Sequence, residues 1–401
     1  MLRNHVRPAI TKATVLIMGG PDVDLRLELM GHLQADFEML AAGTAIELQP
    51  RFVSAGFRYY PYPLGRTISP VADLYSIGYI WRMCRTLRPH IIHTFDAKPG
   101  VWGRLAARWA GVPVVIGTLP GLGSLYANDN LSTRLMRTIY QPLQKWSSHV
   151  SDLTIFQNGD DARQFIAAGV VPERKAMVIP GSGVATEVFA PARVSHTARM
   201  RLRDELGIQP DEIVVTMISR VIRSKGVLEF MAAAREVGAS HPHLRFLLIG
   251  PDDDQSLDRL SEAELAQLKQ VVTWPGPRRD IPTVLAISDI FVFPSAYREG
   301  IPRVLLEAAS MGLPIITTDA PGCNEVVENG VNGFWVPAHD SAAISQAMVQ
   351  LIAQPELRRR FGQASRQRVV ARFDLSLIVQ QTRSVYQQLL ARRASLPATE
   401  A

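Results

Sequence analysis

Short apolar runs alternate with segments of helical periodicity along the whole chain, and this alternation limits the possible folds more than any other feature. The pattern is typical of βαβ units, in which helices connect the strands of a parallel sheet and cover its faces. In the first half the strand-like runs are residues 15–18, 90–93, 114–117 and 153–157. In the second half they are residues 213–218, 245–249, 271–274, 290–293, 314–317 and 333–336. We therefore predict an α/β protein with two parallel sheets.

A segment rich in Gly, Pro and small residues, residues 179–192, separates the two series of strands. Because 401 residues exceed what one hydrophobic core usually supports, this break is the expected domain boundary. We predict a first Rossmann-like, doubly wound domain over residues 1–185 and a second over residues 200–372, with residues 373–401 packing back on the first. Open sheets of this kind bind ligands at the carboxyl ends of their strands, so the site is expected in a cleft between the domains.

The composition excludes several classes of protein. The net charge of +6 suits an anionic ligand or the anionic inner face of a membrane and does not require nucleic acid. The two cysteines, Cys84 and Cys323, fit neither a disulfide framework nor a metal-ligand spacing, which favours a reducing compartment. No stretch reaches the roughly 20 apolar residues of a transmembrane helix, and the start lacks the apolar core of a signal peptide. We expect a cytoplasmic protein, free or peripheral on the inner membrane.

The segment E-G-I-P-R-V-L-L-E, residues 299–307, is the most informative about function. It follows a strand and opens a helix near Pro302, where a proline costs no hydrogen bond. Gly300 allows a ligand to approach the backbone, and the start of the helix suits a diphosphate. Glu307 falls on the second turn, where its carboxylate can accept hydrogen bonds from sugar hydroxyls. The alternative is a well-capped buried helix with incidental glutamates.

Two cations, Arg220 and Lys225, follow another strand in the segment I-S-R-V-I-R-S-K-G, and Gly226 begins the next helix. Paired cations at the carboxyl edge of a sheet can bind a diphosphate and neutralise the charge of a leaving phosphate. Alone they would be solvated charges, but beside the glutamate segment they favour a site for a nucleotide diphosphate.

Two further loops are expected to complete the pocket. Arg279 and Ile281 follow a strand in W-P-G-P-R-R-D-I-P and can offer backbone groups to a nucleobase. The loop D-A-P-G-C-N-E-V-V, residues 319–327, opens another helix. Each loop by itself would equally be an ordinary turn.

The second half resembles the retaining glycosyltransferases of family 4, which have the GT-B fold of two Rossmann-like domains facing a central cleft. The resemblance is carried by S-R-V-I-R-S-K-G and by P-S-A-Y-R-E-G-I-P-R-V-L-L-E-A-A-S-M-G-L-P through N-G-V-N-G-F. The first half is similar to the subgroup that assembles polyprenyl-diphosphate-linked oligosaccharides for capsule, O-antigen or exopolysaccharide. The matching pieces are H-T-F-D-A-K-P-G-V-W-G, G-L-G-S-L-Y, F-Q-N-G-D-D and I-P-G-S-G-V.

The resemblance implies a nucleotide-sugar donor as co-substrate, with UDP-sugars favoured, and transfer with retention, without a metal or other cofactor. It implies that Arg220 and Lys225 hold the donor diphosphate, that Glu307 binds the ribose and that Glu299 faces the transferred sugar. Glu299, Arg220 and Lys225 are the predicted catalytic residues. Backbone contacts to the donor are expected from Gly300, Ile301 and Pro302. The resemblance implies that the acceptor hydroxyl attacks the sugar on the same face from which the nucleotide leaves. The alternative mechanism, ranked second, passes through a covalent intermediate on Glu299.

The first domain is expected to line the acceptor side of the cleft. A lone histidine at a strand end is more often a hydrogen-bonded structural residue than a ligand contact. For His93 we therefore keep both interpretations, a structural role and contact with the sugar or the acceptor. The acceptor-side candidates are Gly20, His93, Asp96, Gly121 and Gly123.

The segment 131–146 mixes Arg and Lys with Leu, Met, Ile and Trp. It is either an ordinary packed helix or a surface that seats a lipid-linked acceptor at the membrane. Two other functions stay open from the residues: a nucleotide-sugar epimerase or hydrolase, and a non-catalytic protein that binds nucleotide sugars.

Overall fold

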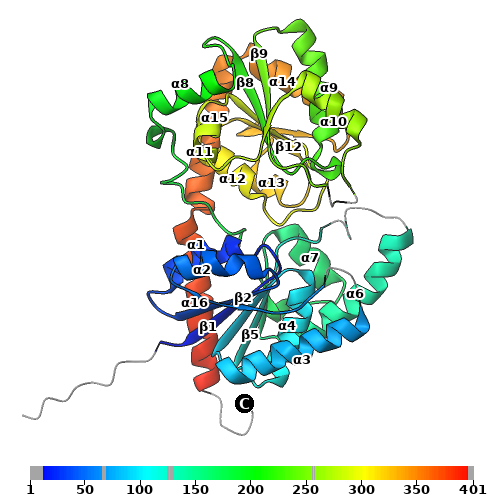
Figure 1. Cartoon of the computed structure of the whole chain (residues 1–401), viewed down its shortest axis with the longest axis vertical. Coiled ribbons are helices and arrows are strands. Elements are labelled where there is room, and N and C mark those ends of the chain that lie inside the picture. Colours follow the sequence, from blue (N-terminus) through cyan, green and yellow to red (C-terminus); the bar gives the residue numbers. More distant parts are fainter. Residues whose placement is uncertain are drawn as a thin grey trace, which may run out of the picture.

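A computed structural model describes residues 12–65, 69–123, 126, 131–254, 256 and 258–395. Two domains, each built on one parallel sheet, are stacked along the long axis of the molecule (Figure 1). The predicted fold class, two Rossmann-like domains, is confirmed. The two ends of the predicted domains, residues 1–11 and 396–401, lie outside the described residues, as do residues 124–125 of the G-L-G-S-L-Y motif.

The first sheet has seven strands in the order β3-β2-β1-β4-β5-β6-β7, all parallel. Valine and isoleucine fill its central strands, because a parallel sheet is buried on both faces. The strands are β1 (Thr14–Met18), β2 (Glu38–Gly43), β3 (Arg58–Pro61), β4 (Ile91–Phe95), β5 (Val114–Leu119), β6 (Leu153–Phe156) and β7 (Ala176–Val178).

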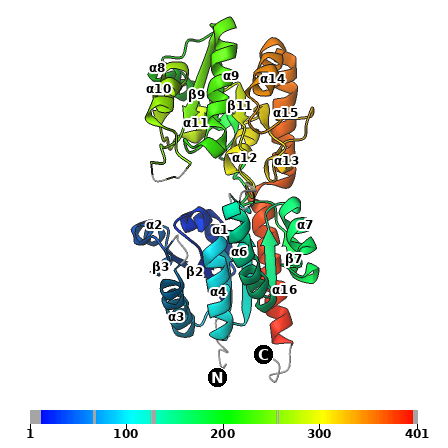
Figure 2. The same ribbon diagram turned by 90° about the vertical axis from the view of Figure 1, so that its right-hand side faces the viewer.

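Helices cover both faces of this sheet (Figures 1 and 2). Residues of α1 and α16 pack with one face of β1, β4 and β5, while α3 and α4 pack on the other face. The helices are α1 (Leu27–Leu33), α2 (Gln49–Ser54), α3 (Pro70–Leu87), α4 (Ala97–Trp109), α6 (Leu131–Val150), α7 (Gly159–Ala167) and α16 (Leu375–Ala394).

The second sheet has six parallel strands in the order β10-β9-β8-β11-β12-β13. They are β8 (Ile213–Ile218), β9 (Leu244–Ile249), β10 (Thr273–Gly276), β11 (Ile290–Phe293), β12 (Ile315–Thr318) and β13 (Gly333–Val336). Two apolar clusters, one on each face, join this sheet to its helices. The helices are α8 (His196–Glu205), α9 (Val227–Ser240), α10 (Glu262–Val271), α11 (Ile281–Ala286), α12 (Arg303–Ser310), α13 (Cys323–Val326), α14 (Ser341–Ala353) and α15 (Pro355–Arg372).

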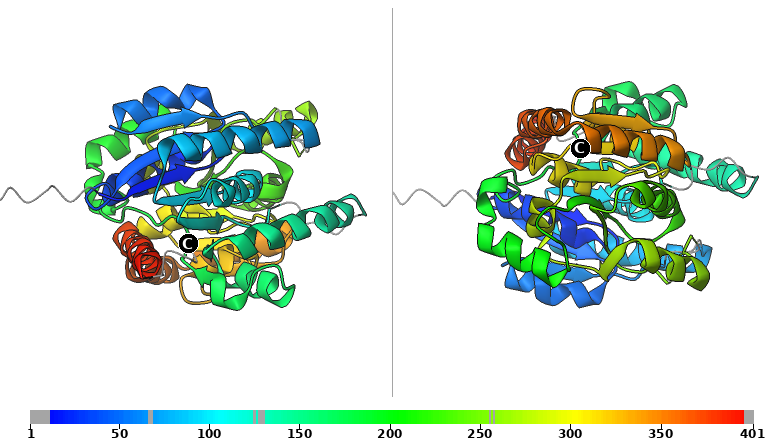
Figure 3. Two further views of the ribbon diagram at one scale, coloured as in Figure 1. Left: turned by 90° about the horizontal axis from the view of Figure 1, so that it is seen from below. Right: turned by 90° about the horizontal axis from the view of Figure 1, so that it is seen from above.

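The chain crosses between the domains twice, and the two crossings run side by side. The Val184 N–H donates to the carbonyl of Phe373 at 3.0 Å, and the Leu375 N–H donates to the carbonyl of Val184 at 3.0 Å. Beyond this point α16 returns to the first domain, where Tyr386 is fully buried in the core beside β4. Figure 3, viewed along the long axis, shows α15 and α16 on the same side of the molecule.

The strand pattern identified all six strands of the second sheet but missed β2, β3 and β7 of the first. Two of the missed strands, β3 and β7, lie at the sheet edges and have four and three residues. The third, β2, contains Ala41 and Ala42, and alanine is a weak strand former. Residues 341–372 form two helices, α14 and α15, because Pro355 disfavours helical geometry at Gln354.

Candidate active site

The polar residues singled out in the sequence lie where the strand order of each sheet reverses. In the first sheet this point is between β1 and β4, which are followed by Gly20 and Asp96. In the second it is between β8 and β11, which are followed by Lys225 and Glu299. A crevice opens at such a reversal because the helices on the two sides of it cover opposite faces.

Lys225 and Glu299 form an ion pair across the β8–β11 reversal, with the lysine Nζ donating to the Glu299 carboxylate. Their side chains are only 12% and 15% exposed, so the pair is shielded from water. The Lys225 Nζ also lies 5.5 Å from the ring centre of Phe293 and 5.1 Å from that of Tyr297. These contacts hold the lysine in one place at the carboxyl edge of the sheet.

Gly226 makes the sharp turn from Lys225 into α9 possible. Its φ is +79°, and an added Cβ would lie 2.3 Å from the carbonyl oxygen of Pro294. No other residue fits here without moving the loop that leads to Glu299.

Arg220 lies in the same loop as Lys225 but is more exposed. Its Nη1 donates to the Asp253 carboxylate at 2.7 Å, and half of its side chain is open to solvent. Asp253 belongs to the polar run P-D-D-D-Q after β9. Both cations therefore have carboxylate partners, and both lie at the edge where a diphosphate would add negative charge.

Glu307 is buried on α12, the helix that follows the loop carrying Glu299. Burial raises the pKa of its carboxyl, and the charge of Arg303 acts in the opposite direction. The Arg303 Nε donates to Glu307 Oε1 at 2.9 Å. Among the described residues, Glu307 Oε2 receives no hydrogen bond and is the oxygen left for a ligand.

The loop carrying Glu299 and Gly300 is pressed against the first domain. An added Cβ on Gly300 would lie 2.0 Å from the carbonyl oxygen of Pro120, and one on Gly121 would lie 2.5 Å from the Gly300 nitrogen. The Asn158 amide donates to the carbonyl oxygens of Glu299 at 3.2 Å and Gly300 at 3.0 Å. Only glycine permits two backbones to approach this closely, so the domains meet at this loop.

Ion pairs and hydrogen bonds extend the contact on either side of the loop. Arg298 pairs with the buried Asp161 at 2.8 Å. The Gly159 N–H donates to Glu325 at 3.0 Å, and the Asn324 amide donates to Asp160 at 3.2 Å. These contacts connect the start of α7 with the E-G-I-P loop and with α13.

The first domain contributes a cavity of about 870 Å³ beside this contact. It is lined by Gly20, Asp96, Gly121 and Gly123, and by Tyr297 from the second domain. The Asp96 carboxylate accepts a hydrogen bond from the Gly20 N–H at 2.8 Å, which fixes the loop after β1. Much of the remaining wall is apolar and comes from Trp102, Met136, Ile139 and Leu143.

His93 is enclosed in the core of the first domain and does not line the cavity. Its Nδ1 lies 2.6 Å from the Tyr386 hydroxyl on α16, and its Nε2 lies 2.7 Å from the Thr118 hydroxyl. Burial, together with the nearby charge of Arg26, lowers the pKa of His93 to about 3, so the ring is neutral. With both ring nitrogens bonded inside the core, His93 has the contacts of a structural residue, and neither nitrogen faces a ligand.

The remaining donor-side candidates lie around the same edge. Arg279 is exposed in the loop after β10, and Ile281 is the first residue of α11. Ile301 is buried and would contact a Cβ added to Gly181 at 3.1 Å, while Pro302 caps α12. The structure thus brings Lys225, Glu299 and Gly300 together directly.

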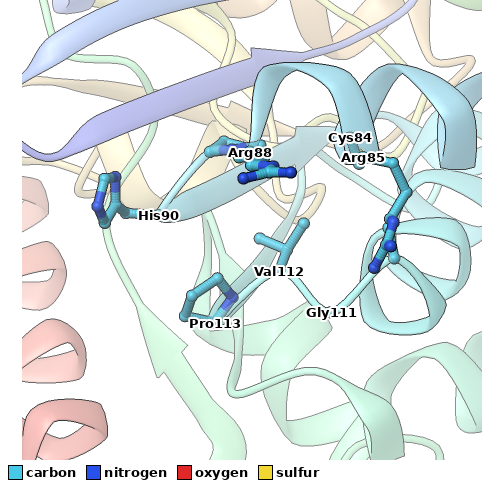
Figure 4. A pocket seen from close by; sticks show the side chains of 9 residues that line it. Cys84, Arg85, Arg88, His90, Gly111, Val112 and Pro113 are labelled. Carbon is cyan, nitrogen blue, oxygen red and sulfur yellow. The ribbon is translucent and has the colours of Figure 1, made fainter.

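A second cavity, of about 320 Å³, lies at the opposite edge of the first sheet (Figure 4). It is lined by Arg85, Arg88 and His90 among others, and His90 directly precedes β4. It contains none of the predicted site residues. Among the described residues, no group of three or more His, Cys, Asp or Glu side chains is placed to hold a metal ion. No helix within the described ranges is long and apolar enough to cross a membrane.

Several residues of the site were missed in the sequence. Tyr297 and Arg298 stand directly before Glu299, and Asn158 belongs to F-Q-N-G-D-D, so their positions gave a usable signal. No sequence signal identifies Glu28, because its partner Arg303 is 275 residues away.

Comparison with known proteins finds two family models that match different parts of this chain. Residues 198–368 match the family model of glycosyl transferases group 1, and residues 26–181 match that of the glycosyl transferase 4-like domain. An Escherichia coli protein named UDP-Gal:alpha-D-GlcNAc-diphosphoundecaprenol alpha-1,3-galactosyltransferase is 28% identical over 97% of this chain and 99% of its own length. An alpha-maltose-1-phosphate synthase of Mycolicibacterium smegmatis is 30% identical over 75% of this chain and 79% of its own length.

Among solved structures, HepE of Anabaena in complex with UDP has a TM-score of 0.77 to this chain at 20% identity. The match covers 94% of this chain and all of HepE, so the similarity extends over both domains. It supports the GT-B architecture.

Proposed function

Because this chain belongs to the group 1 glycosyltransferases of the family 4 type, we propose that it transfers a hexose or N-acetylhexosamine from a UDP-sugar to a polyprenyl-diphosphate-linked glycan. The transfer retains the anomeric configuration and needs no metal. The reaction serves the biosynthesis of cell-surface polysaccharide. The observation that carries this proposal is the shielded Lys225–Glu299 pair at the carboxyl edge of the second sheet, close in sequence to Tyr297, which lines the large cavity.

On the donor side, Arg220 and Lys225 bind the diphosphate and Glu307 binds the ribose through its open Oε2. The bond from the anomeric carbon to the phosphate oxygen breaks, and the acceptor oxygen forms its bond on the same face. The acceptor proton passes to the departing phosphate oxygen. The cations neutralise the charge that develops on this phosphate, an effect worth several kcal/mol in a site shielded from water.

Glu299 faces the transferred sugar in this proposal. Its contact with Lys225 keeps it close to the position where the diphosphate meets the sugar. A covalent route would place the sugar on the Glu299 carboxylate before the acceptor attacks. The two routes give the same configuration, so they are separated by trapping experiments and not by product analysis.

On the acceptor side, the cavity of the first domain suits a glycan joined to a lipid. Asp96, Lys98 and the loop at Gly121 offer polar groups near Tyr297, and α6 provides the apolar wall. Gly20, Gly121 and Gly123 allow the acceptor to approach the backbone. The E. coli relative, whose name specifies a diphosphoundecaprenol acceptor, supports this class of substrate.

The outer surface of α6 supports attachment to the cytoplasmic face of the inner membrane. Leu131, Leu135 and Trp146, which do not line the cavity, are about half exposed or more. Arg134, Arg137 and Lys145 lie on the same helix. Apolar side chains beside basic ones are the combination that binds an anionic lipid surface. Such attachment would bring the enzyme to its lipid-linked acceptor.

The proposal is tested by incubating the protein with UDP-sugars and a synthetic polyprenyl-diphosphate-linked acceptor. We expect a product heavier by one sugar in mass spectra, with the donor's anomeric configuration in NMR spectra and unchanged yield in EDTA. A reaction with donor alone is the control. Consumption of donor without acceptor would instead identify a hydrolase or epimerase, and nucleotide binding without any turnover would identify a binding protein.

A further inference from the structure

Arg303 joins the two domains at the residue predicted to bind the ribose. It is the first residue of α12, and its guanidinium makes two bonds of 2.9 Å. The Nε donates to Glu307 on the same helix, and Nη2 donates to Glu28 on α1 of the first domain. One planar group thus connects a buried donor-side carboxylate to the opposite wall of the cleft.

The geometry divides the oxygens of Glu307 between two tasks. Arg303 occupies Oε1, and Oε2 is open among the described residues. A guanidinium that is itself held by Glu28 keeps Oε1 of Glu307 at a set position, which restricts the orientation of the carboxylate. The carboxylate is therefore already oriented before a ribose arrives.

Charge acts in the same direction as geometry. Burial favours the neutral form of Glu307, and Arg303 opposes this effect. The charged groups facing Glu307 are Arg303 from its own helix and Glu28 from α1, and Glu28 adds a negative charge nearby. Arg26, buried on the first-domain side, faces Arg303 in turn. A carboxylate that must accept bonds from a ribose diol has to be ionised, and Arg303 is the cation in contact with it.

We infer that Arg303 is a positioning residue that orients Glu307 and keeps it ionised for the ribose, and that holds the donor wall in register with the first domain through its contact with Glu28. The inference rests on the proposed function, since it needs Glu307 to bind a nucleotide. It makes two separable statements. The Glu307 contact governs affinity for the nucleotide, and the Glu28 contact governs the rate of transfer.

The first statement is tested by titrating UDP into wild-type and Arg303→Gln protein by calorimetry from about pH 8 to about pH 5.5. We expect roughly tenfold weaker binding of UDP to the variant at the upper end, the size of one lost charge-assisted contact. The pKa of Glu307 rises further without the cation, so the variant loses its remaining affinity at a higher pH than the wild type does. Arg303→Lys keeps the charge and is expected to recover much of the wild-type pH profile.

The second statement is tested with Glu28→Gln, which keeps the Arg303–Glu307 contact. We expect UDP affinity within about twofold of wild type and a kcat roughly tenfold lower, since misaligned domains lower the rate without removing donor contacts. Arg359→Gln, at an exposed position on α15, is the matched control and should change neither quantity. Thermal unfolding of each variant verifies that it is folded.

The outcomes are distinct. An Arg303→Gln protein with wild-type UDP affinity and pH profile would overturn the inference while leaving the proposed function intact. A fall in UDP affinity for Glu28→Gln equal to that of Arg303→Gln would overturn the division between affinity and rate. If the wild-type protein bound none of UDP, GDP or ADP, the proposed function would fall and this inference with it.

Discussion

The two walls of the cleft are built in opposite ways. The wall from the second domain is dense and polar: Lys225, Glu299, Arg303 and Glu307 each have a charged partner within hydrogen-bonding distance. The wall from the first domain is open, with a cavity of about 870 Å³ whose larger lining area is apolar.

The difference matches the chemistry proposed for each side. A diphosphate is small, identical in every nucleoside-diphosphate sugar and strongly charged, so fixed cations at set positions bind it best. A lipid-linked glycan is larger and partly apolar, so it needs room and an apolar wall more than it needs fixed charges. The E-G-I-P loop is the boundary between the two, because Gly300 contacts Pro120 and Gly121 of the other domain.

The largest effect is expected from removing the central cation of the polar wall. Lys225→Ala should lower kcat about a thousandfold, since one preorganised group facing the leaving phosphate contributes about 3–4 kcal/mol. Transfer of radiolabelled sugar measures it. Lys269→Ala, on the surface of α10 in the same domain, is the control. A Lys225→Ala enzyme with more than about a tenth of wild-type activity would contradict the assignment of this wall to the diphosphate.

The boundary between the walls is tested with Gly300→Ala. Its Cβ would overlap the carbonyl oxygen of Pro120, so the domains must separate at the loop. A displacement of about 1 Å at a reacting centre lowers the rate roughly a hundredfold. We expect that loss in kcat together with a larger radius of gyration in solution scattering. Gly31→Ala, where an added Cβ meets nothing within 4 Å, should be neutral. Unchanged kcat in Gly300→Ala would show that this contact does not limit the reaction.

The apolar wall continues onto the outer surface of α6, which is tested with anionic vesicles. Reversing the charges of Arg134, Arg137 and Lys145 together should weaken vesicle binding about a hundredfold or more, at roughly 1 kcal/mol per basic residue. Flotation assays with phosphatidylglycerol vesicles measure it. The control reverses three exposed second-domain cations, Arg201, Arg235 and Arg359. Equal loss in both variants would mean that net charge alone drives binding.

The smallest effect concerns stability of the first domain. The pKa of His93 is about 3 in the folded protein, below its ordinary value, so the unfolded chain binds a proton that the folded chain does not. Its contribution to stability is present above about pH 6.5 and is lost as the pH falls, at about 1.4 kcal/mol per pH unit. Wild type should therefore lose about 2 kcal/mol more than His93→Gln between about pH 6.5 and pH 5.

Urea denaturation at the two pH values measures this difference. The exposed residue His196 provides the control substitution, His196→Gln. If the wild type and His93→Gln lost the same stability on acidification, the prediction that His93 stays neutral in the folded core would be wrong.

Most of the fold could be predicted because its signal is local. Each central strand is a short apolar run, and the loops after β8 and β11 are recognised by glycine and charge within a few residues of a strand end. The edge strands β3 and β7 could not be predicted, because three or four partly exposed residues show no clear alternation of apolar and polar side chains.

The sequence by itself determined the two parallel sheets and the segments at their carboxyl edges. It also singled out Lys225, Glu299 and Glu307 as candidate site residues of the second domain. Only the tertiary structure decided which of these residues meet. His93 is enclosed by Tyr386, 293 residues away, and Glu307 shares Arg303 with Glu28 of the other domain. Local patterns record which residues form a strand or a turn, whereas these contacts depend on how two domains and a returning helix pack, and no short segment of the chain contains that information.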